Sequence, residues 1–444
     1  MSTHSQPRTR ESSIGFLETW EHLVGRRGVP TLARRRGRKP RIPLRQLLPA
    51  LTFHVMQDAG TLADHVFQLF REPLADSSWS DRRLRLPWEI FAELMRRALR
   101  PRATVRRHPE AFWRNWRVLA LDGTQFSLIN TPQIAAVRTK VRTRRGRAAF
   151  AKMTATVLLE VGLHNPLAAG IGRQGESEWA LALRLLAQLP KRAVLLADRL
   201  YGVPAFLAHA SAACARVGSQ FVVRASASVK PRLIRRLDDG SRLVQLAVRA
   251  PHNPTRILAW LTVREIRVHV GRPGHRPHLL RVWTSLLQPT AAPALEVARL
   301  YASRWEHELY FREVKRQVRK TALLQSHTVE TAAQEIAALV LASAVLATER
   351  ARAVTGQVPV LRIRLGQVLQ IVRGMWLFFG PFEHLFTEPQ KTQVLRHAYA
   401  LMRRDLTEPR RSRTCPRAVR QPMKAWPRLM QPQSIEGPMH FRLV

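Results

Sequence analysis

The sequence has little cysteine, and none of its apolar runs reaches the length of a membrane span. Two cysteines, Cys214 and Cys415, stand far apart in 444 residues, which excludes a disulfide framework and a Cys-rich zinc site. Such sparing use of cysteine fits a reducing, cytoplasmic compartment. The longest apolar run, 336–347, lies between Glu335 and Glu349 and is too short to cross a bilayer. It predicts a buried helix, and no membrane partner is expected.

Acidic residues are also scarce. The chain has 31 Asp and Glu against 73 Lys and Arg, which gives a net charge of +42 and a pI near 11.8. Biased codon usage would explain the preference for Arg over Lys, but it would not explain the shortage of acids. A charge this large requires a polyanionic partner, with nucleic acid as the first candidate and an anionic membrane surface as the second. The composition therefore predicts nucleic-acid binding.

Changes in periodicity along the chain predict an α/β protein with several regions. Residues 45–110 have helical periodicity, whereas the segment from 116 has the order strand, hairpin, helix, strand, helix, strand. Residues 228–288 are again strand-rich, and helices resume near 294. The predicted regions are a basic N-terminal arm that is mobile until DNA is bound (1–44), a helical DNA-binding domain (45–110), an α/β domain in two segments (111–227 and 289–353), a β-strand insertion (228–288), a C-terminal helical region (354–405) and a basic disordered tail (406–444).

Two of the few aspartates end strongly apolar strands. Asp122 closes VLALDG and Asp198 closes VLLADR. A carboxylate at the end of a buried strand is held rigidly at a sheet edge, where ligands collect in α/β folds. Each aspartate also has an ordinary structural interpretation, because Asp before Gly is a common turn and Asp after a strand commonly caps a helix. The strands alone leave both interpretations open.

The segment 301–318, YASRWEHELYFREVKRQV, adds a single carboxylate to this pair. At about 100° per residue, a helix would gather four functional groups within an arc of about 60°. These are Tyr301, Arg304, Glu308 and Lys315. Glu306 and Glu313 fall on another face, so Glu308 is the acid that this pattern selects. The alternative is an ordinary helix with an Arg304–Glu308 ion pair four residues apart.

A cluster of cations follows Asp122. Residues 133–152 hold seven Lys or Arg and no acid, which predicts a loop that contacts DNA phosphates, although a plain solvated loop has the same composition. The strongest DNA-binding candidates in it are Arg142, Arg144 and Arg145. Glu176 and Glu178 begin a helix, where the helix dipole favours carboxylates, and we assign them a structural role.

Three sequence blocks together resemble one protein family. The segment 301–318 resembles the Y-(2)-R-(3)-E-(6)-K signature of bacterial insertion-sequence transposases of the DDE class, the IS-four type, at all four positions. LALDGTQFSL resembles the block around the first Asp of that family, and LLADRLYG the block around the second. The resemblance covers about 116–370. Leu200 departs from it, standing where a small residue is common, and the N-terminal region matches no known pattern.

This resemblance implies that 111–227 and 289–353 form a ribonuclease-H-like catalytic domain, which the β-rich segment 228–288 interrupts. The strand order above agrees with it. It implies that Asp122, Asp198 and Glu308 hold Mg²⁺, with Mn²⁺ as a substitute, for phosphodiester hydrolysis and transesterification. Tyr301, Arg304 and Lys315 would contact phosphates near the cut. It also implies a homodimer acting on double-stranded DNA, at the ends of an element and at its target. Relatives of this class hold a flipped base with an aromatic of the insertion, a role that Trp260 or Trp283 could fill here by stacking. A tryptophan in such a position is more often a core aromatic.

The leading functional hypothesis is a cut-and-paste DNA transposase located in the cytoplasm, at the nucleoid. One alternative is a non-catalytic DNA-binding or architectural protein derived from a transposase, which the charge alone would fit. A second is a ribonuclease-H-like nuclease that cuts DNA without strand transfer. The three carboxylates favour an enzyme over the first alternative.

Overall fold

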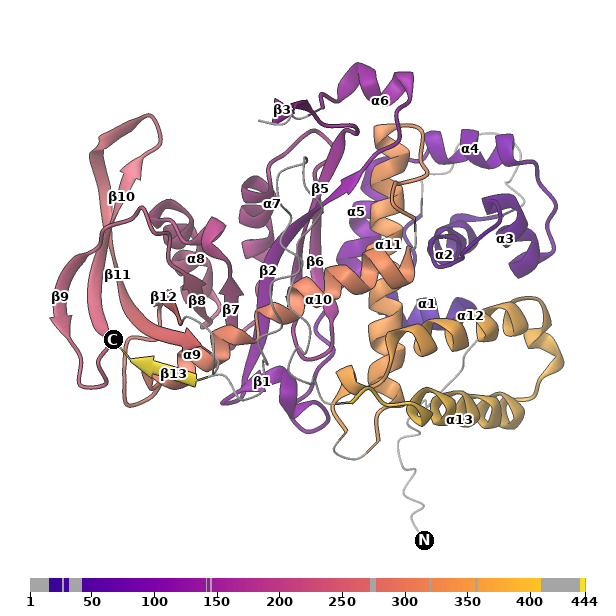
Figure 1. Ribbon diagram of the computed structural model, residues 1–444. Coiled ribbons are helices and arrows are strands. Elements are labelled where there is room, and N and C mark those ends of the chain that lie inside the picture. Colours follow the sequence, from indigo (N-terminus) through magenta and orange to yellow (C-terminus); the bar gives the residue numbers. More distant parts are fainter. Residues whose placement is uncertain are drawn as a thin grey trace, which may run out of the picture.

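A single large mixed sheet forms the centre of the computed structural model (Figure 1). The structure describes residues 16–25, 28–31, 42–140, 142–143, 146–271, 277–319, 321–355, 358–408 and 440–443. The strand order is β6-β5-β2-β7-β8-β12-β11-β10-β9, with β1 paired to β2 and β13 paired to β11. The strands are β1 (Phe112–Trp113), β2 (Trp116–Ser127), β5 (Lys152–Glu160), β6 (Asn165–Ile171), β7 (Ala193–Ala197), β8 (Gln220–Arg224), β9 (Arg232–Arg236), β10 (Arg242–Ala250), β11 (Asn253–Gly271), β12 (His278–Thr284) and β13 (His440–Leu443).

The strand-rich segment predicted at 228–288 is confirmed as strands, but it does not form a separate sheet. β12 pairs with β8 through the contact of Val282 with Arg224, so β9 to β12 continue the central sheet. The long strands β10 and β11 extend this edge as a hairpin, seen at the left of Figure 1. The α/β class predicted from the sequence is confirmed by this arrangement.

The register of β2 and β7 places the two predicted aspartates at the same level of the sheet. These strands are parallel, and their pairing ends at Leu121 opposite Ala197, one residue before each aspartate. The expectation that Asp122 ends its strand was wrong, because β2 continues to Ser127 along β5. β7 ends one residue before the level of Asp122, so β2 has no partner strand on that side beyond Leu121. Asp122 therefore lies at the end of the β2–β7 pairing although it is inside β2.

Helices surround the sheet in two groups. α7 (Glu178–Leu185), α8 (Pro204–Arg216), α9 (Ala294–Ala302) and α10 (Trp305–Glu313) follow the strands of the catalytic region, and a π-helical turn, η5 (Val314–Val318), extends α10. The other helices are α1 (Phe16–Val24), α2 (Leu44–Val55), α3 (Leu62–Phe70), α4 (Asp76–Leu84), α5 (Trp88–Ala98), α6 (Pro132–Val137), α11 (Val329–Ala353), α12 (Leu365–Phe382) and α13 (Glu388–Arg404). A separate ribbon, β3 (Arg142–Thr143) with β4 (Gly146–Arg147), follows α6.

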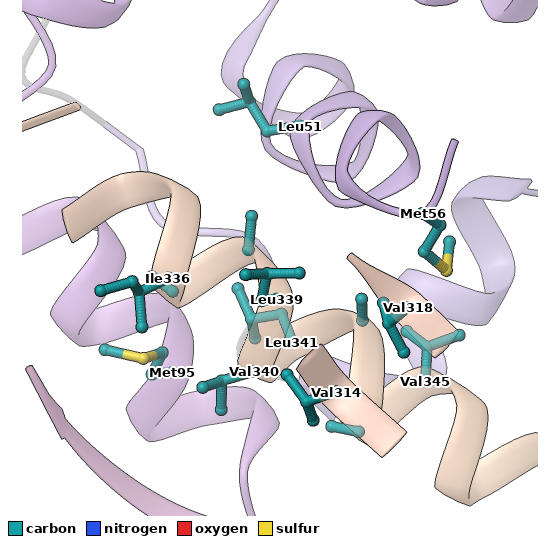
Figure 2. Packing of buried hydrophobic residues seen from close by; sticks show 14 of the residues in the cluster. Leu51, Met56, Met95, Val314, Val318, Ile336, Leu339, Val340, Leu341 and Val345 are labelled. Carbon is teal, nitrogen blue, oxygen red and sulfur yellow. The ribbon is translucent and has the colours of Figure 1, made fainter. Parts of the chain in front are cut away.

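Helix α11 is the centre of the main hydrophobic core. It contains the predicted buried run, and residues such as Ile336, Leu339 and Val345 meet side chains of α2, α5 and the π-helical turn (Figure 2). In the described part of the chain α11 is the one helix long and apolar enough to cross a membrane, and 94% of its apolar window is buried inside the protein. Its burial identifies it as a core helix, as the sequence predicted.

Two described segments near the chain ends form elements that were not predicted. Most of the predicted arm and tail, including 1–15, 32–41 and 409–439, lies outside the described residues. Part of the expected N-terminal arm forms α1, whose Trp20 and Leu23 are 1% exposed in the same core as α11. Part of the expected disordered tail forms β13, whose Phe441 and Leu443 pack beside α9 and β11. In each case a few apolar side chains of a basic segment pack against apolar residues that are distant in sequence. The composition of the segment itself does not indicate this packing. The helices predicted at 45–110 likewise share the α11 core, so they are not packed as a separate unit.

Candidate active site

Asp122 and Asp198 have neither of the ordinary roles that their sequence contexts suggested. Gly123 lies within β2 rather than in a turn, and its N–H donates to Asp122 Oδ1 at 2.9 Å. Asp198 precedes the short 3₁₀ helix η4 (Arg199–Tyr201), yet its side chain makes no capping hydrogen bond. Its buried Oδ1 has no hydrogen-bond partner among the described residues. A buried carboxylate oxygen without a partner is costly, and a bound cation would relieve that cost.

The environment of Asp122 disfavours its ionised form. Burial raises the pKa of Asp122 from 3.8 to about 7. The Gly123 N–H opposes this shift, the nearby carboxylates of Glu178 and Asp198 add to it, and Arg304 lowers it. The raised pKa is therefore mainly the cost of burying an ionised carboxylate, to which the neighbouring acids add.

Metal-free protein should become less stable as the pH rises through the titration of Asp122. The folded state binds this proton more tightly than the unfolded chain, so deprotonation between about pH 4 and pH 7 favours unfolding. Replacing Asp122 with Asn should remove up to about 4 kcal/mol of this penalty at about pH 8 and have little effect at about pH 4. Urea unfolding in EDTA at both pH values measures this difference, and equal gains at both would contradict it.

Glu308, on α10, is linked to Asp122 through Arg304. His307, the preceding residue, is fully buried and its Nε2 lies 3.0 Å from the carbonyl of Val157, which is the cross-strand partner of Asp122. This contact fixes α10 across β5 and β2. Arg304 then lies between the acids, with Nη2 donating to Glu308 Oε1 at 2.9 Å and Nη1 at 3.7 Å from Asp122 Oδ2.

The predicted Arg304–Glu308 ion pair is therefore present, and it also extends to Asp122. The single helix predicted from Tyr301 was wrong in detail, since α9 ends at Ala302 and α10 begins at Trp305. The backbone between them stays in the right-handed helical region at Arg304. This short break does not rotate Arg304 and Glu308 apart, which explains why the helical spacing still predicted their proximity.

The other two members of the predicted arc have different surroundings. Lys315 lies in the π-helical turn, where Nζ donates to Thr124 Oγ1 at 2.6 Å and to the Gln125 carbonyl at 2.8 Å. Burial lowers the pKa of Lys315 to about 8. The Tyr301 hydroxyl is buried without a hydrogen-bond partner in the described part of the chain, and burial raises its pKa to about 12. Lys315 thus contacts the part of β2 that continues beyond Asp122. Tyr301 lies next to Arg304, whose guanidinium is over its ring.

Asp122, Asp198 and Glu308 are of the residue types that bind a hard divalent cation. Their carboxylates do not point to a common position in the structure. Carboxylate oxygens are the ligands that Mg²⁺ prefers, and the unpartnered Asp198 Oδ1 provides one. Within the described ranges, no three His, Cys, Asp or Glu side chains are arranged so that they could hold a metal ion. The guanidinium of Arg304 contacts both Asp122 and Glu308 instead.

Glu178 is a site residue whose position the sequence interpretation missed. It begins α7 as predicted, but its side chain also lies over Gly123, where a Cβ would fall 2.2 Å from Glu178 Cδ. Tyr201, three residues after Asp198, donates to Glu178 Oε1 at 2.7 Å. Glu178 therefore connects the segments that carry the two aspartates. The only local indication is the glycine after Asp122, which leaves room for this carboxylate.

The remaining candidates divide between core and surface. Trp283 is fully buried with its indole N–H near Glu265, as a core aromatic, whereas Trp260 is 46% exposed on β11. Glu176 pairs with Arg184 at 3.0 Å, as expected for a structural role. In the basic loop, Arg138 donates to the carbonyls of 172 and 173 rather than remaining solvated. Arg144 and Arg145 lie outside the described residues, and Arg142 is described only by its backbone in β3.

Comparison with known proteins identifies a family for this chain. The family model described as "Transposase DDE domain" matches residues 114–345, slightly more than half of the chain. The chain is 28% identical over 241 residues to the transposase InsG for insertion sequence element IS4 of Escherichia coli (strain K12). That match covers 53% of this chain and 52% of the relative, about half of its length. A solved structure, the piggyBac transposase synaptic complex with hairpin DNA, is similar over 89% of this chain and 88% of that one, with a TM-score of 0.45 and 8% identity.

Proposed function

Because the chain belongs to the family of DDE-domain transposases, we propose that it cuts DNA at the ends of a mobile element and joins those ends to a target. The observation that carries this proposal is the β2–β7 register, which brings Asp122 and Asp198 together under the helix that bears Glu308. The matched family region contains all three residues. We further propose that the part of the sheet from β6 to β8 is the ribonuclease-H-like core of the enzyme.

Asp122, Asp198 and Glu308 would hold Mg²⁺, or Mn²⁺ in its place, since enzymes of the DDE class use divalent metal ions. Two such ions, when bound, stabilise the attacking and leaving oxygens of a phosphodiester. The raised pKa of Asp122 matters here, because the carboxyl must lose its proton before it can act as a ligand. Occupation of the site would also require Arg304 to leave at least one of its two carboxylate partners.

The released guanidinium of Arg304 is suited to a second task. Arg binds phosphate oxygens through two parallel hydrogen bonds, and Arg304 is placed beside the carboxylates that would face the scissile bond. The Arg304 guanidinium lies over the ring of Tyr301, and Lys315 contacts β2 two residues beyond Asp122. We assign these three residues, together with the loop residues Arg142, Arg144 and Arg145, to the DNA phosphates. The +42 charge supports binding of both element ends and target, and we propose a homodimer on paired ends.

A direct test uses the inverted repeats that flank the coding region. Short duplexes that carry one repeat should be nicked at the element end in Mg²⁺ or Mn²⁺, and a pre-nicked duplex should join to a supercoiled target. EDTA should abolish both products. Gel analysis of labelled strands separates nicking from joining.

The two outcomes that contradict the proposal identify the alternatives. Nicking without any joined product from the pre-nicked duplex would indicate a nuclease of the same fold. Sequence-specific binding without metal-dependent nicking, under conditions where the protein is folded, would indicate a non-catalytic DNA-binding protein. A scrambled repeat of the same length is the matched control, since a protein this basic binds any DNA.

A further inference from the structure

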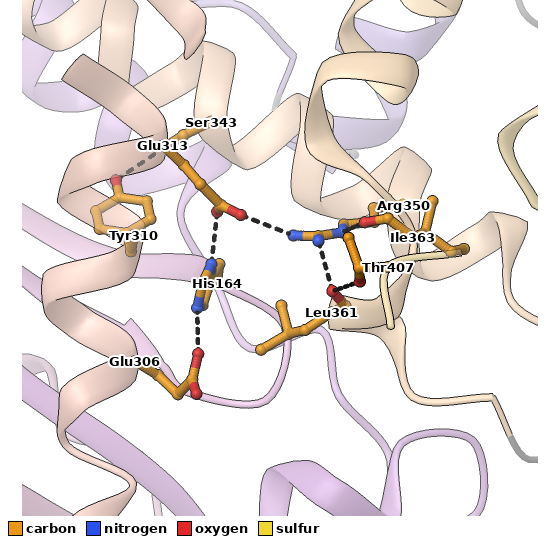
Figure 3. Close-up of polar contacts among 9 residues, drawn as sticks. All are labelled: His164, Glu306, Tyr310, Glu313, Ser343, Arg350, Leu361, Ile363 and Thr407. Atoms are coloured by element: carbon orange, nitrogen blue, oxygen red, sulfur yellow. Dashed lines mark hydrogen bonds and ion pairs between the residues drawn. The ribbon is translucent and has the colours of Figure 1, made fainter. Parts of the chain in front are cut away.

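The two acids on the other face of α10 converge on one buried histidine. His164 Nδ1 lies 2.5 Å from Glu313 Oε2, and His164 Nε2 lies 3.0 Å from Glu306 Oε2 (Figure 3). His164 comes from the turn between β5 and β6, where its φ of +53° is a left-handed conformation. Its side chain is 6% exposed, and those of Glu306 and Glu313 are 18% and 16% exposed. The contact is therefore largely screened from water.

Hydrogen bonding determines the protonation of this group. An ionised carboxylate only accepts hydrogen bonds, so an imidazole held between two carboxylates must donate from both nitrogens. That ring is an imidazolium. Arg350 of α11 completes the charge balance, with Nη1 3.4 Å from Glu313 Oε1. Two cations thus face two anions, which is the condition under which buried charges are tolerated.

The surrounding contacts favour the same protonation states. Burial alone would lower the pKa of His164, but Glu313 and Glu306 outweigh it and raise that pKa. Burial would raise the pKa of Glu313, yet His164 and Arg350 hold it at about 2. Tyr310 contributes the edge of a ring next to His164 rather than a charge.

The cluster joins three parts of the fold to the helix that carries Glu308. Arg350 also donates to the carbonyls of Ile363 at 2.7 Å and Leu361 at 2.9 Å, so the segment before α12 is included. Glu306 and Glu313 are seven residues apart, about two turns, and share one face of the helix. Bonds from one ring to both positions restrict rotation of α10 about its axis as well as sliding along it. Glu308, about 200° from Glu306, is then held toward β2.

We propose that His164 is a positioning residue for catalysis, whose imidazolium, held between Glu306 and Glu313, sets the rotation of α10 and so the direction of Glu308. The effect on catalysis rests on the proposed function. The protonation of His164 is independent of it. It assigns a role to two carboxylates that the helical spacing separated from Glu308.

The first experiment measures the protonation of His164 directly. Long-range ¹H–¹⁵N spectra of the full chain, labelled at histidine, should show His164 with both nitrogens protonated at about pH 8, where an ordinary histidine is neutral. The resonance is assigned by its loss in His164→Gln. A neutral tautomer at this pH would overturn the proposal whether or not the protein is a transposase.

The second experiment measures the catalytic consequence by single-turnover cleavage of end duplexes over a pH series. A raised histidine pKa gives a contribution that is complete below about pH 6.5 and is lost as the pH rises through the folded-state pKa. Glu306→Gln removes one anion, so its alkaline loss of activity should begin at lower pH than in wild type. His164→Gln should slow cleavage about tenfold or more with DNA affinity changed less than about twofold.

Glu296→Gln is the matched control, because Glu296 is a part-exposed acid of α9 paired with Arg114. It should leave both rate and pH profile as in wild type. Wild-type cleavage in His164→Gln, or an unshifted profile in a folded Glu306→Gln protein, would overturn the positioning role. If wild type itself neither nicks nor joins, the proposed function fails, and the ¹⁵N spectrum still decides whether the imidazolium exists.

Discussion

Replacing Asp122 or Asp198 with Asn, or Glu308 with Gln, is expected to lower DNA cleavage by at least about 1,000-fold each, because the neutral amide keeps the shape but loses the anionic ligand. Asp198 should be the most sensitive position. Its Oδ1 is buried without a partner, so no neighbouring group among those described compensates for its loss. The rate constants of nicking and of joining, measured separately in Mg²⁺, give the size of each effect.

Binding should behave differently from cleavage in these variants. The protein binds DNA largely through its cations, and removal of one negative charge from the site should leave affinity for end duplexes equal or slightly higher. Asp238→Asn is the control, since Asp238 is exposed in the turn between β9 and β10. Cleavage within about tenfold of wild type in any of the three variants would remove that residue from the proposed site.

Patterns that depend on neighbours in sequence predicted most of the fold. The apolar runs identified β2 and β7, Glu178 indicated the start of α7, and the apolar stretch at 336–347 identified the core of α11. Each of these signals is local, because burial of one strand or helix face leaves a repeat in the sequence. The proximity of Arg304 and Glu308 was predictable for the same reason, from four residues of helix.

What could not be predicted depends on pairing between distant segments. β12 pairs with β8, and the insertion therefore extends the central sheet. The sequence of neither strand alone indicates this pairing. Glu178 has an ordinary helix-start context, and only the approach of α7 to Gly123 brings it beside Asp122. His164 lies in a turn 142 residues before Glu306, and nothing near it in the chain marks it as the partner of two acids.

Replacing Arg304 with Ala is expected to lower cleavage about 100-fold and to increase the stabilisation of the protein by Mg²⁺. In the structure Arg304 partly neutralises Asp122 and Glu308, so its removal leaves both carboxylates without this cation in metal-free protein. The free energy of unfolding in EDTA should fall by about 1 kcal/mol, a small value because Glu308 is 38% exposed. A divalent cation then no longer competes with the guanidinium, and its binding stabilises the folded state more than in wild type.

The cleavage defect has a separate cause, which is the loss of a cation beside the phosphate on which charge develops. Arg304→Lys separates the two effects, since it keeps the charge but loses the planar pair of donors. It should restore stability in EDTA close to wild type while cleavage remains well below it. Arg299→Ala, an exposed arginine of α9, is the control for loss of one positive charge. An unchanged thermal shift with Mg²⁺ in Arg304→Ala would show that the guanidinium does not occupy the place that the metal requires.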